Sequence, residues 1–373
     1  PTGVTGQYID AFSPSVGGGF DGIPDLMYVN LENPTKFVGN QFNVRIDYNF
    51  TQKDSFTVST YFTPTRSENA DAAGRSRQIG DIKSERLNWS AAFIYNRVIS
   101  ARMFNEFRFN INRWGFNEIE SNPDANFGVP RIEVEGYPID RVRFGAPRSE
   151  GTPGIFKETQ IDIRNIFNWV VGNHNLKIGG EFRKEMNDNS LIGGARPLYS
   201  FVGLWNLAND APIFESINAD PTTGAGATGE REYNGNNYAL FVQNDWKTRP
   251  YLTLNLGLRW EYYSPLTDKT GMQSNLFFGS RGLADSQVRL TEKLFESDWN
   301  NFGPQLGFAW SPEFLNGKGV LRGGFGIGYN RLPNSVFLNT RGNPPFFARY
   351  GLCCATPDDP YNGGRILYAL GSS

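Results

Sequence analysis

The sequence predicts an all-β fold: an antiparallel transmembrane β-barrel segment of about ten strands, with short periplasmic turns and long extracellular loops. Apolar and polar residues alternate in ten separate segments, mostly about nine to thirteen residues long. Long connections fall only at every second position between these segments. About nine to eleven tilted residues cross a bilayer, whereas strands of soluble proteins usually contain about five or six.

The alternation is clearest in residues 251–263, where one face is apolar and the other holds Thr, Asn, Gly, Arg and Glu in turn. Successive side chains of a strand point to opposite faces, so this pattern predicts a strand with one apolar face. In order along the chain, the ten segments are residues 41–50, 55–63, 87–98, 103–113, 159–171, 175–184, 237–247, 251–263, 300–310 and 319–330.

The connections alternate in length. The short turns are residues 51–54, 100–102, 172–174 and 248–250, with a somewhat longer turn at 311–318. The long connections are residues 64–85, 115–157, 185–236 and 264–298, and the stretch that follows residue 330. Structureless loops longer than about 15 residues are uncommon in compact soluble domains, whereas outer-membrane barrels place their long loops at the outer end. The alternation therefore favours a membrane barrel over a soluble sheet with one solvated face.

This pattern divides the chain into three parts. Residues 1–39 are expected to form a long loop before the first clear strand, and residues 40–330 to form the barrel strands with their loops. Residues 331–373 are expected to form an extracellular loop that is truncated, so the chain is interpreted as a portion of a larger barrel. A closed barrel of ten strands is the alternative, because an open sheet edge in lipid would leave backbone groups unpaired.

The two faces of the predicted strands differ in charge. The apolar faces carry almost none and suit lipid, while the opposite faces carry both signs and suit paired networks in a lumen. The candidate lumen-facing residues are Arg45, Asp47, Glu106, Arg108, Arg164, Glu181, Arg183, Asp245, Arg259, Glu261 and Arg322.

Aromatic side chains cluster in two of the long connections. Their rings suit contacts with sugars, peptides or metal chelates, and packing of the loops on each other is the alternative role. The candidate ligand-contact residues are Tyr199, Phe201 and Trp205 in one loop and Phe346, Phe347 and Tyr350 in another.

Several kinds of chemistry are excluded. A net charge of −2 gives no electrostatic reason for nucleic-acid binding. The single histidine, His174, lies in a predicted turn, so sites that need several histidines cannot form. Residues 324–328 lack the full dinucleotide-binding spacing. We therefore expect no enzyme, no catalytic residue, no metal site and no cofactor.

Four runs resemble the barrel of TonB-dependent outer-membrane receptors, and the Oar-like receptors in particular. They are residues 173–182 (NHNLKIGGEF), 238–247 (YALFVQNDWK), 252–263 (LTLNLGLRWEYY) and 301–310 (NFGPQLGFAW). The resemblance implies a 22-stranded barrel filled by an N-terminal plug in a Gram-negative outer membrane, and TonB-energised transport of a scarce or bulky substrate. No plug is recognisable here, so a partial chain is expected.

The expected partners are outer-membrane lipid, an unknown transported ligand and, through the absent plug region, the TonB complex. Two other functions remain open from the sequence. One is a non-transporting surface barrel with adhesive or binding loops. The other is a soluble all-β binding module.

Overall fold

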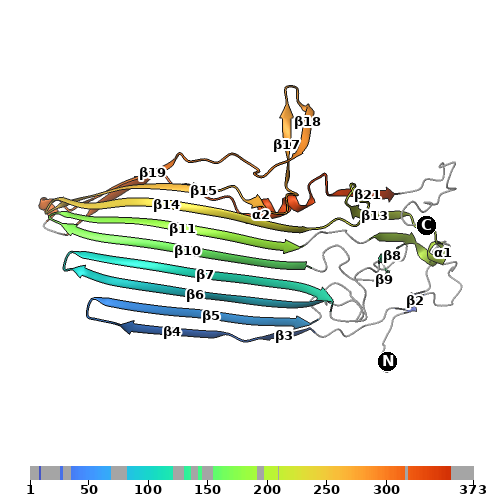
Figure 1. Cartoon of the computed structure of the whole chain (residues 1–373), viewed down its shortest axis with the longest axis horizontal. Helices are drawn as coiled ribbons and strands as arrows, with labels where there is room; N and C mark the ends of the chain where they lie inside the picture. Colours follow the sequence, from blue (N-terminus) through green and yellow to red (C-terminus); the bar gives the residue numbers. More distant parts are fainter. Residues whose placement is uncertain are drawn as a thin grey trace.

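The structure is a computed structural model in which one large antiparallel sheet dominates (Figure 1). None of the helices in the described residues is long and apolar enough to span a bilayer. The residues that the structure describes are 8–9, 26–27, 35–68, 82–120, 130–135, 142–144, 154–190, 197–208, 210–315 and 318–353.

The large sheet has 12 strands and contains all ten predicted segments. Along the sheet the order is β20-β19-β15-β14-β11-β10-β7-β6-β5-β3, with β4 also paired to β5 and the short β16 paired to β14. In chain order the strands are β3 (Lys36–Gly39), β4 (Phe42–Asn49), β5 (Asp54–Glu68), β6 (Ile82–Ser100), β7 (Met103–Glu120), β10 (Gly154–Val171), β11 (His174–Ser190), β14 (Glu230–Arg249), β15 (Leu252–Tyr263), β16 (Thr267–Asp268), β19 (Asn301–Trp310) and β20 (Leu321–Gly326). Within the described residues β20 does not pair with β3 or β4, so this sheet is open.

The strand lengths differ from those predicted. β6 contains 19 residues and β14 contains 20, because antiparallel pairing continues through polar residues beyond the apolar stretch of each strand. The last strand is shorter than predicted, since β20 ends at Gly326. The short turns gather at one end of the sheet and the long connections at the other, as the chain alternation predicts (Figure 1). Gly172, in the turn between β10 and β11, has a φ of +55°, which glycine adopts without strain.

An apolar band crosses one face of the sheet. The register places eight apolar or aromatic side chains in one row across eight strands: Ile46, Val58, Phe93, Phe109, Ile163, Phe182, Tyr238 and Tyr262. Their neighbours in the band are largely uncovered, with Leu240 59% exposed and Phe302 51% exposed. A water-facing surface would rarely carry so much contiguous apolar area, so this band fits a nonpolar environment.

The strands cross this band obliquely. The row that begins with Phe42, Phe62 and Trp89 at one edge of the sheet continues through Arg113 and Thr159 and ends at Asn234 and Thr267. Nearer the turns, the same face of β14, β15 and β19 carries Trp246, Leu254 and Phe308. The band therefore shifts toward the turns from β4 to β19, as strand tilt in a membrane barrel requires.

A close contact on the polar face fixes how β11 and β14 pack. Gly179 lies directly opposite Phe241, and a Cβ at residue 179 would lie 2.4 Å from the Phe241 ring and 2.9 Å from the Asn165 carbonyl oxygen. The Arg259 guanidinium lies 5.8 Å from the centre of the same ring. The ring therefore occupies the space that any side chain at residue 179 would need.

We expect Gly179→Ala to destabilise the sheet by about 1–3 kcal/mol, because either the ring or the neighbouring backbone must move. Gly257→Ala is the matched control on the same face, since its Cβ would come no closer than 3.4 Å to another heavy atom. Denaturant unfolding of the two variants in detergent compares them. Equal stability would show that Phe241 does not pack on Gly179.

The long connections form further sheets. A five-stranded sheet joins β8 (Arg131–Glu135), β9 (Val142–Phe144), β12 (Leu198–Val202), β13 (Phe214–Ala219) and β21 (Ala348–Cys353), in the order β21-β13-β12-β8-β9. Two strand pairs stand apart: β1 (Tyr8–Ile9) with β2 (Leu26–Met27), and β17 (Ser274–Gly279) with β18 (Gly282–Leu290). The short helices are α1 (Gly203–Ala208), η3 (Glu313–Leu315), α2 (Asn334–Leu338) and η4 (Asn339–Gly342). The β17–β18 hairpin projects away from the large sheet (Figure 1).

Candidate functional site

Charged side chains meet on the polar face of the large sheet, opposite the apolar band. Arg164 of β10 lies directly across from Glu181 of β11, and Glu181 is two positions from Arg183 on the same face. Glu181 also faces Ala239 of β14, which lies across from Glu261 of β15. Strands β10, β11 and β15 therefore bring together, across β14, five of the residues predicted to face the lumen: Arg164, Glu181, Arg183, Arg259 and Glu261.

Glu181 is the centre of this cluster. Its carboxylate lies 3.2 Å from Nε of Arg164, and the other carboxylate oxygen lies 3.3 Å from Nη2 of Arg259. Arg259 also donates through Nε to Oε1 of Glu261 at 2.7 Å. Each charge of the cluster therefore has a partner of opposite sign, which limits the cost of removing it from water.

Two further ion pairs lie beside Glu181, toward the end of the sheet that carries the long loops. Arg183 is hydrogen-bonded to Asp162 across β10 and β11. Glu185 pairs with Arg331 and accepts a hydrogen bond from Nε2 of Gln160 at 3.0 Å. Neither residue was predicted to face the lumen. Glu185 lies just beyond the predicted strand segment 175–184, and Arg331 lies in a connection without alternating apolar and polar residues, which reaches the sheet only because the chain folds back.

The remaining candidates on this face lie away from the cluster. Arg45 pairs with Asp47 at 2.8 Å on β4, and Arg108 pairs with Glu106 at 2.7 Å on β7. Asp245 accepts from Nδ2 of Asn255 at 2.7 Å. The last candidate, Arg322, is exposed on β20. The structure thus brings five of the eleven predicted residues together and leaves the other six outside the cluster, four of them as two local ion pairs.

The aromatic candidates converge partly. The pairing of β12, β13 and β21 puts Tyr199, Phe201 and Tyr350 on one face of the five-stranded sheet. Phe201 is only 3% exposed, whereas Tyr350 is 45% exposed. The other candidates are Trp205, which lies in α1 with a side chain outside the described part, and the half-buried Phe346 and Phe347 before β21.

Residues 327–347, here called the return segment, fold back from β20 onto the polar face of the large sheet. Tyr233 of β14 is fully buried, and its hydroxyl lies 2.9 Å from Oγ1 of Thr340. The Tyr233 ring packs with Leu266 and Phe337 in a small apolar core. The return segment is thereby fixed over the outer part of β14.

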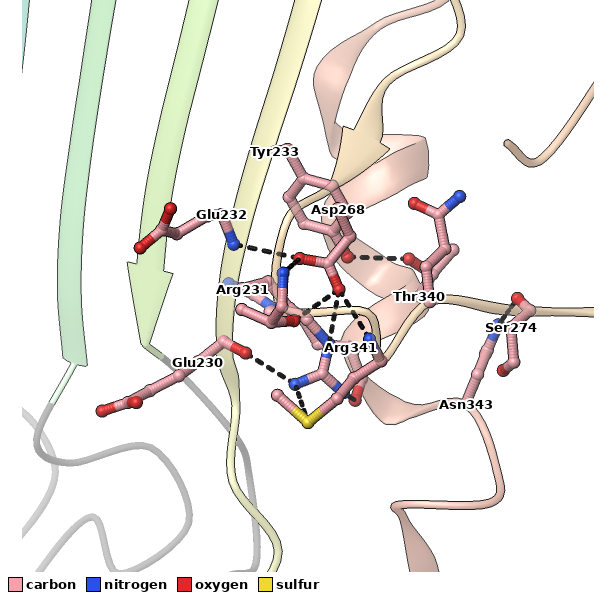
Figure 2. Close-up of polar contacts among 12 residues, drawn as sticks. Glu230, Arg231, Glu232, Tyr233, Asp268, Ser274, Thr340, Arg341 and Asn343 are labelled. Atoms are coloured by element: carbon pink, nitrogen blue, oxygen red, sulfur yellow. Dashed lines mark hydrogen bonds and ion pairs between the residues drawn. The ribbon is translucent and has the colours of Figure 1, made fainter. Parts of the chain in front are cut away.

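Arg231 and Asp268 hold this arrangement together. Both side chains are fully buried and lie 3.7 Å apart at their nearest atoms, at the centre of the contacts in Figure 2. Arg231 donates to the carbonyl oxygens of Glu230 at 2.6 Å and Arg341 at 3.2 Å. It therefore links β14 to the return segment.

Asp268 organises the loop that follows β15. Its carboxylate accepts from the backbone nitrogens of Glu232, Thr270 and Met272 at 3.1–3.2 Å, and from the Thr270 hydroxyl at 2.6 Å. Burial lowers the pKa of the Arg341 guanidinium nearby, and the charge of Arg231 lowers it further. The loop and the return segment are thus joined to the sheet through one buried polar cluster.

A cavity lies between the return segment and the sheet. It encloses about 630 Å³ of space, including the solvent at its mouth. Residues on β11, β14 and β15 form one wall, and residues of the return segment and of the loop before β19 form the other. Among its lining residues are Glu185, Asn237, Tyr263, Asp298, Tyr329 and Arg331. Within the described residues, no group of three or more His, Cys, Asp or Glu is placed to hold a metal ion.

Glu215 of β13 is a buried acid in the five-stranded sheet. Its side chain is 0% exposed, and neither carboxylate oxygen has a hydrogen-bond partner in the described part of the chain. Burial raises the pKa of Glu215 above its ordinary value of 4.5, and the charge of Asp210 raises it further. The folded sheet therefore favours the protonated carboxyl.

A stability that depends on pH follows from this shift. The folded pKa exceeds the unfolded one, so the sheet loses stability as the pH rises from the unfolded value toward and through the folded value. We expect the wild-type sheet to become more sensitive to protease between pH 5 and pH 8, and Glu215→Gln to remove that change. Limited proteolysis at both pH values measures it. The same pH dependence in the variant would contradict the assignment to Glu215.

Comparison with known proteins identifies the family. The family model of the outer membrane beta barrel domain matches residues 10–365 of this chain. The chain belongs to this family. The family is located in the outer membrane, so the alternative of a soluble all-β binding module is excluded. The long strands with alternating apolar and polar residues are strands of an outer-membrane barrel domain. No curated protein matches the chain significantly.

Solved outer-membrane barrels share parts of the fold. The chain is 10% identical to the ferric-catecholate import receptor Fiu from Escherichia coli K12, with a TM-score of 0.43 over 75% of this chain and 42% of that one. The chain is also 10% identical in sequence to the E. coli outer membrane transporter YddB, with a TM-score of 0.42 over 78% of this chain and 39% of that one. The translocator domain of the Neisseria meningitidis autotransporter NalP is 8% identical to the chain in sequence, with a TM-score of 0.29 over 85% of this chain and 79% of that one. This outer-membrane barrel chain thus spans about two fifths of Fiu and YddB, and likeness at this level carries no argument about function.

Proposed function

We propose that this chain forms part of the wall of an Oar-like, TonB-dependent outer-membrane transporter that imports a scarce or bulky substrate. The observation that carries the proposal is the polar face of the sheet. It holds ion-paired charges and an open cavity where a small closed barrel would hold packed side chains. Such a face suits a wide, hydrated lumen.

The rest of the arrangement supports this role. The apolar band suits contact with outer-membrane lipid, and the long connections at one end suit capture of a substrate from outside. The charges of the lumen would guide the substrate, and a plug supplied by another part of the receptor would gate it and contact TonB. The resemblance of residues 238–247 and 252–263 to TonB-dependent receptors supports the energised mechanism over passive diffusion.

One observation favours a surface-binding role without transport as the second candidate. The projecting β17–β18 hairpin exposes large apolar side chains at its tip, with Phe278 69% exposed and Leu283 73% exposed. An exposed apolar tip is a common feature of binding loops. An adhesive barrel would use such loops and would need no plug.

Cross-linking to TonB separates the two candidates. The complete receptor is produced in a Gram-negative outer membrane, and its periplasmic side is cross-linked in living cells. The transporter proposal expects a covalent complex with TonB that disappears when the plug region is removed. Absence of the complex in the complete receptor would overturn the proposal in favour of the adhesive barrel.

A further inference from the structure

The cavity under the return segment has a wall from the barrel and a wall from a loop. Asn237 and Tyr263 face each other across β14 and β15, and Tyr263 donates its hydroxyl to the carbonyl oxygen of Tyr329 at 3.4 Å. Asp298 lies at the opposite wall, where Oδ1 accepts from the backbone nitrogen of Asn300 at 3.1 Å. A ligand here would touch the sheet and the loops together.

The charges around this cavity are already neutralised. Arg331 pairs with Glu185, and the deeper Arg183 pairs with Asp162. Asp298 has no cationic partner within the described contacts, so the cavity carries a slight negative bias. An anionic ligand would therefore have to break an ion pair or lie beside an unpaired carboxylate, and both are unfavourable.

The cavity also offers a neutral hydrogen-bond donor that no described residue uses, the side-chain amide of Asn237. Asn237 is 8% exposed, and its Nδ2 has no hydrogen-bond partner in the described structure although it lines the cavity. Farther along the same polar face, Nδ2 of Asn187 and Nδ2 of Asn189 are also buried without partners there. A buried donor without an acceptor is unfavourable, so a ligand that supplies an acceptor would bind more tightly by satisfying it.

We propose that this cavity binds a neutral, hydroxyl-rich ligand, a segment of an oligosaccharide. A hydroxyl group both accepts and donates, so different hydroxyls of an oligosaccharide segment can accept from Nδ2 of Asn237 and donate to the carboxylate of Asp298. The rings of Tyr263 and Tyr329 supply flat amphipathic surfaces beside these groups. The inference names the substrate class of the transporter proposed above and so rests on that function.

Binding of defined probes tests the proposal. The complete receptor in detergent is titrated calorimetrically with maltohexaose, cellohexaose, xylohexaose and mannohexaose, and separately with hexa-alanine and hexagalacturonate. We expect at least one neutral oligosaccharide to bind and the anionic one not to bind. Asn237→Asp replaces the donor by an acceptor of the same shape and is expected to weaken that binding about tenfold. Asn236→Asp is the matched control, since Asn236 directly precedes Asn237 in β14 and faces the other side of the sheet.

Each outcome bears on the proposal. Binding of only the peptide or the anionic sugar, binding of no probe, or equal affinity of Asn237→Asp and the wild type would each overturn it. Both variants are first compared by heat-dependent gel migration, so that a misfolded barrel is not counted as a loss of affinity. TonB cross-linking is measured apart from binding, so the transport proposal and the substrate class can fail separately.

Discussion

Arg231→Met is expected to release the return segment and the loop after β15 from the sheet. The substitution leaves the fully buried carboxylate of Asp268 without its cation, and breaking such a pair costs about 3–5 kcal/mol. It also removes the donor to the carbonyl oxygen of Arg341. The expected result is rapid protease cleavage within residues 264–300 and 327–347, while the strands of the large sheet remain protected. Limited proteolysis followed by mass spectrometry locates the cuts.

A second substitution separates the lost ion pair from the lost packing. Arg231→Met combined with Asp268→Asn removes both charges, while the amide oxygen of the asparagine can still accept hydrogen bonds from the backbone nitrogens of Glu232 and Thr270. We expect the double variant to recover part of the protection. Protection of Arg231→Met equal to that of the wild type would show that the buried pair does not hold the return segment.

Val58→Lys is expected to destabilise the barrel in the membrane by about 2–4 kcal/mol, the cost of a lysine near the bilayer centre on a lipid-facing strand position. Val58 lies in the middle of the apolar band, between Ile46 and Phe93. Unfolding by denaturant in lipid vesicles measures the free energy, and heat-dependent gel migration shows how much barrel assembles.

Thr57→Lys is the matched control, one residue away on the opposite face of β5. The Thr57 hydroxyl donates to Asp47 at 2.6 Å, and a lysine at the same position can keep an ion pair with that carboxylate. We expect assembly close to that of the wild type. A similar loss for both lysines would mean that the two faces of β5 do not differ in environment, against the barrel assignment.

Much of the large sheet is predictable from the sequence because each strand carries its own evidence. In residues 251–263 the side-chain period of two sorts apolar from polar residues, and membrane and lumen impose the same sorting on every strand. The strand ends are less predictable. β14 begins at Glu230, within a polar stretch whose pairing with β11 depends on backbone hydrogen bonds and not on a hydrophobic pattern.

The candidate site is predictable only where it lies on strands. The alternation already predicts that Arg164, Glu181 and Arg259 lie on one face of the sheet. They come into contact because the antiparallel register of neighbouring strands places them at nearby positions. Arg331 and Thr340 reach the same face through a fold-back of the chain. That path depends on tertiary contacts such as Arg231 with Asp268, which pair residues 37 positions apart in the sequence and leave no periodic signal.

The site also shows why loops matter for the proposed function. The return segment covers part of the polar face, and the cavity beneath it has one amide donor, Nδ2 of Asn237, that no described residue accepts from. A substrate held there would contact both the barrel wall and a loop, so capture at the outer end and passage along the lumen would involve the same residues. Charge pairs deeper in the sheet would then line the route.

Accessibility of single cysteines along β14 tests the central claim, that one face of this sheet contacts lipid and the other lines a polar lumen. After Cys353 and Cys354 are replaced by serine, a spin label is placed at each position from Asn237 to Lys247 in the receptor reconstituted in vesicles. Collision rates with oxygen and with a water-soluble nickel complex report the environment of each label. The account predicts alternation with a period of two: the even-numbered positions, Tyr238, Leu240, Val242, Asn244 and Trp246, are accessible to oxygen, and the odd-numbered positions are accessible to nickel. Uniform access of the nickel complex to both faces would contradict it.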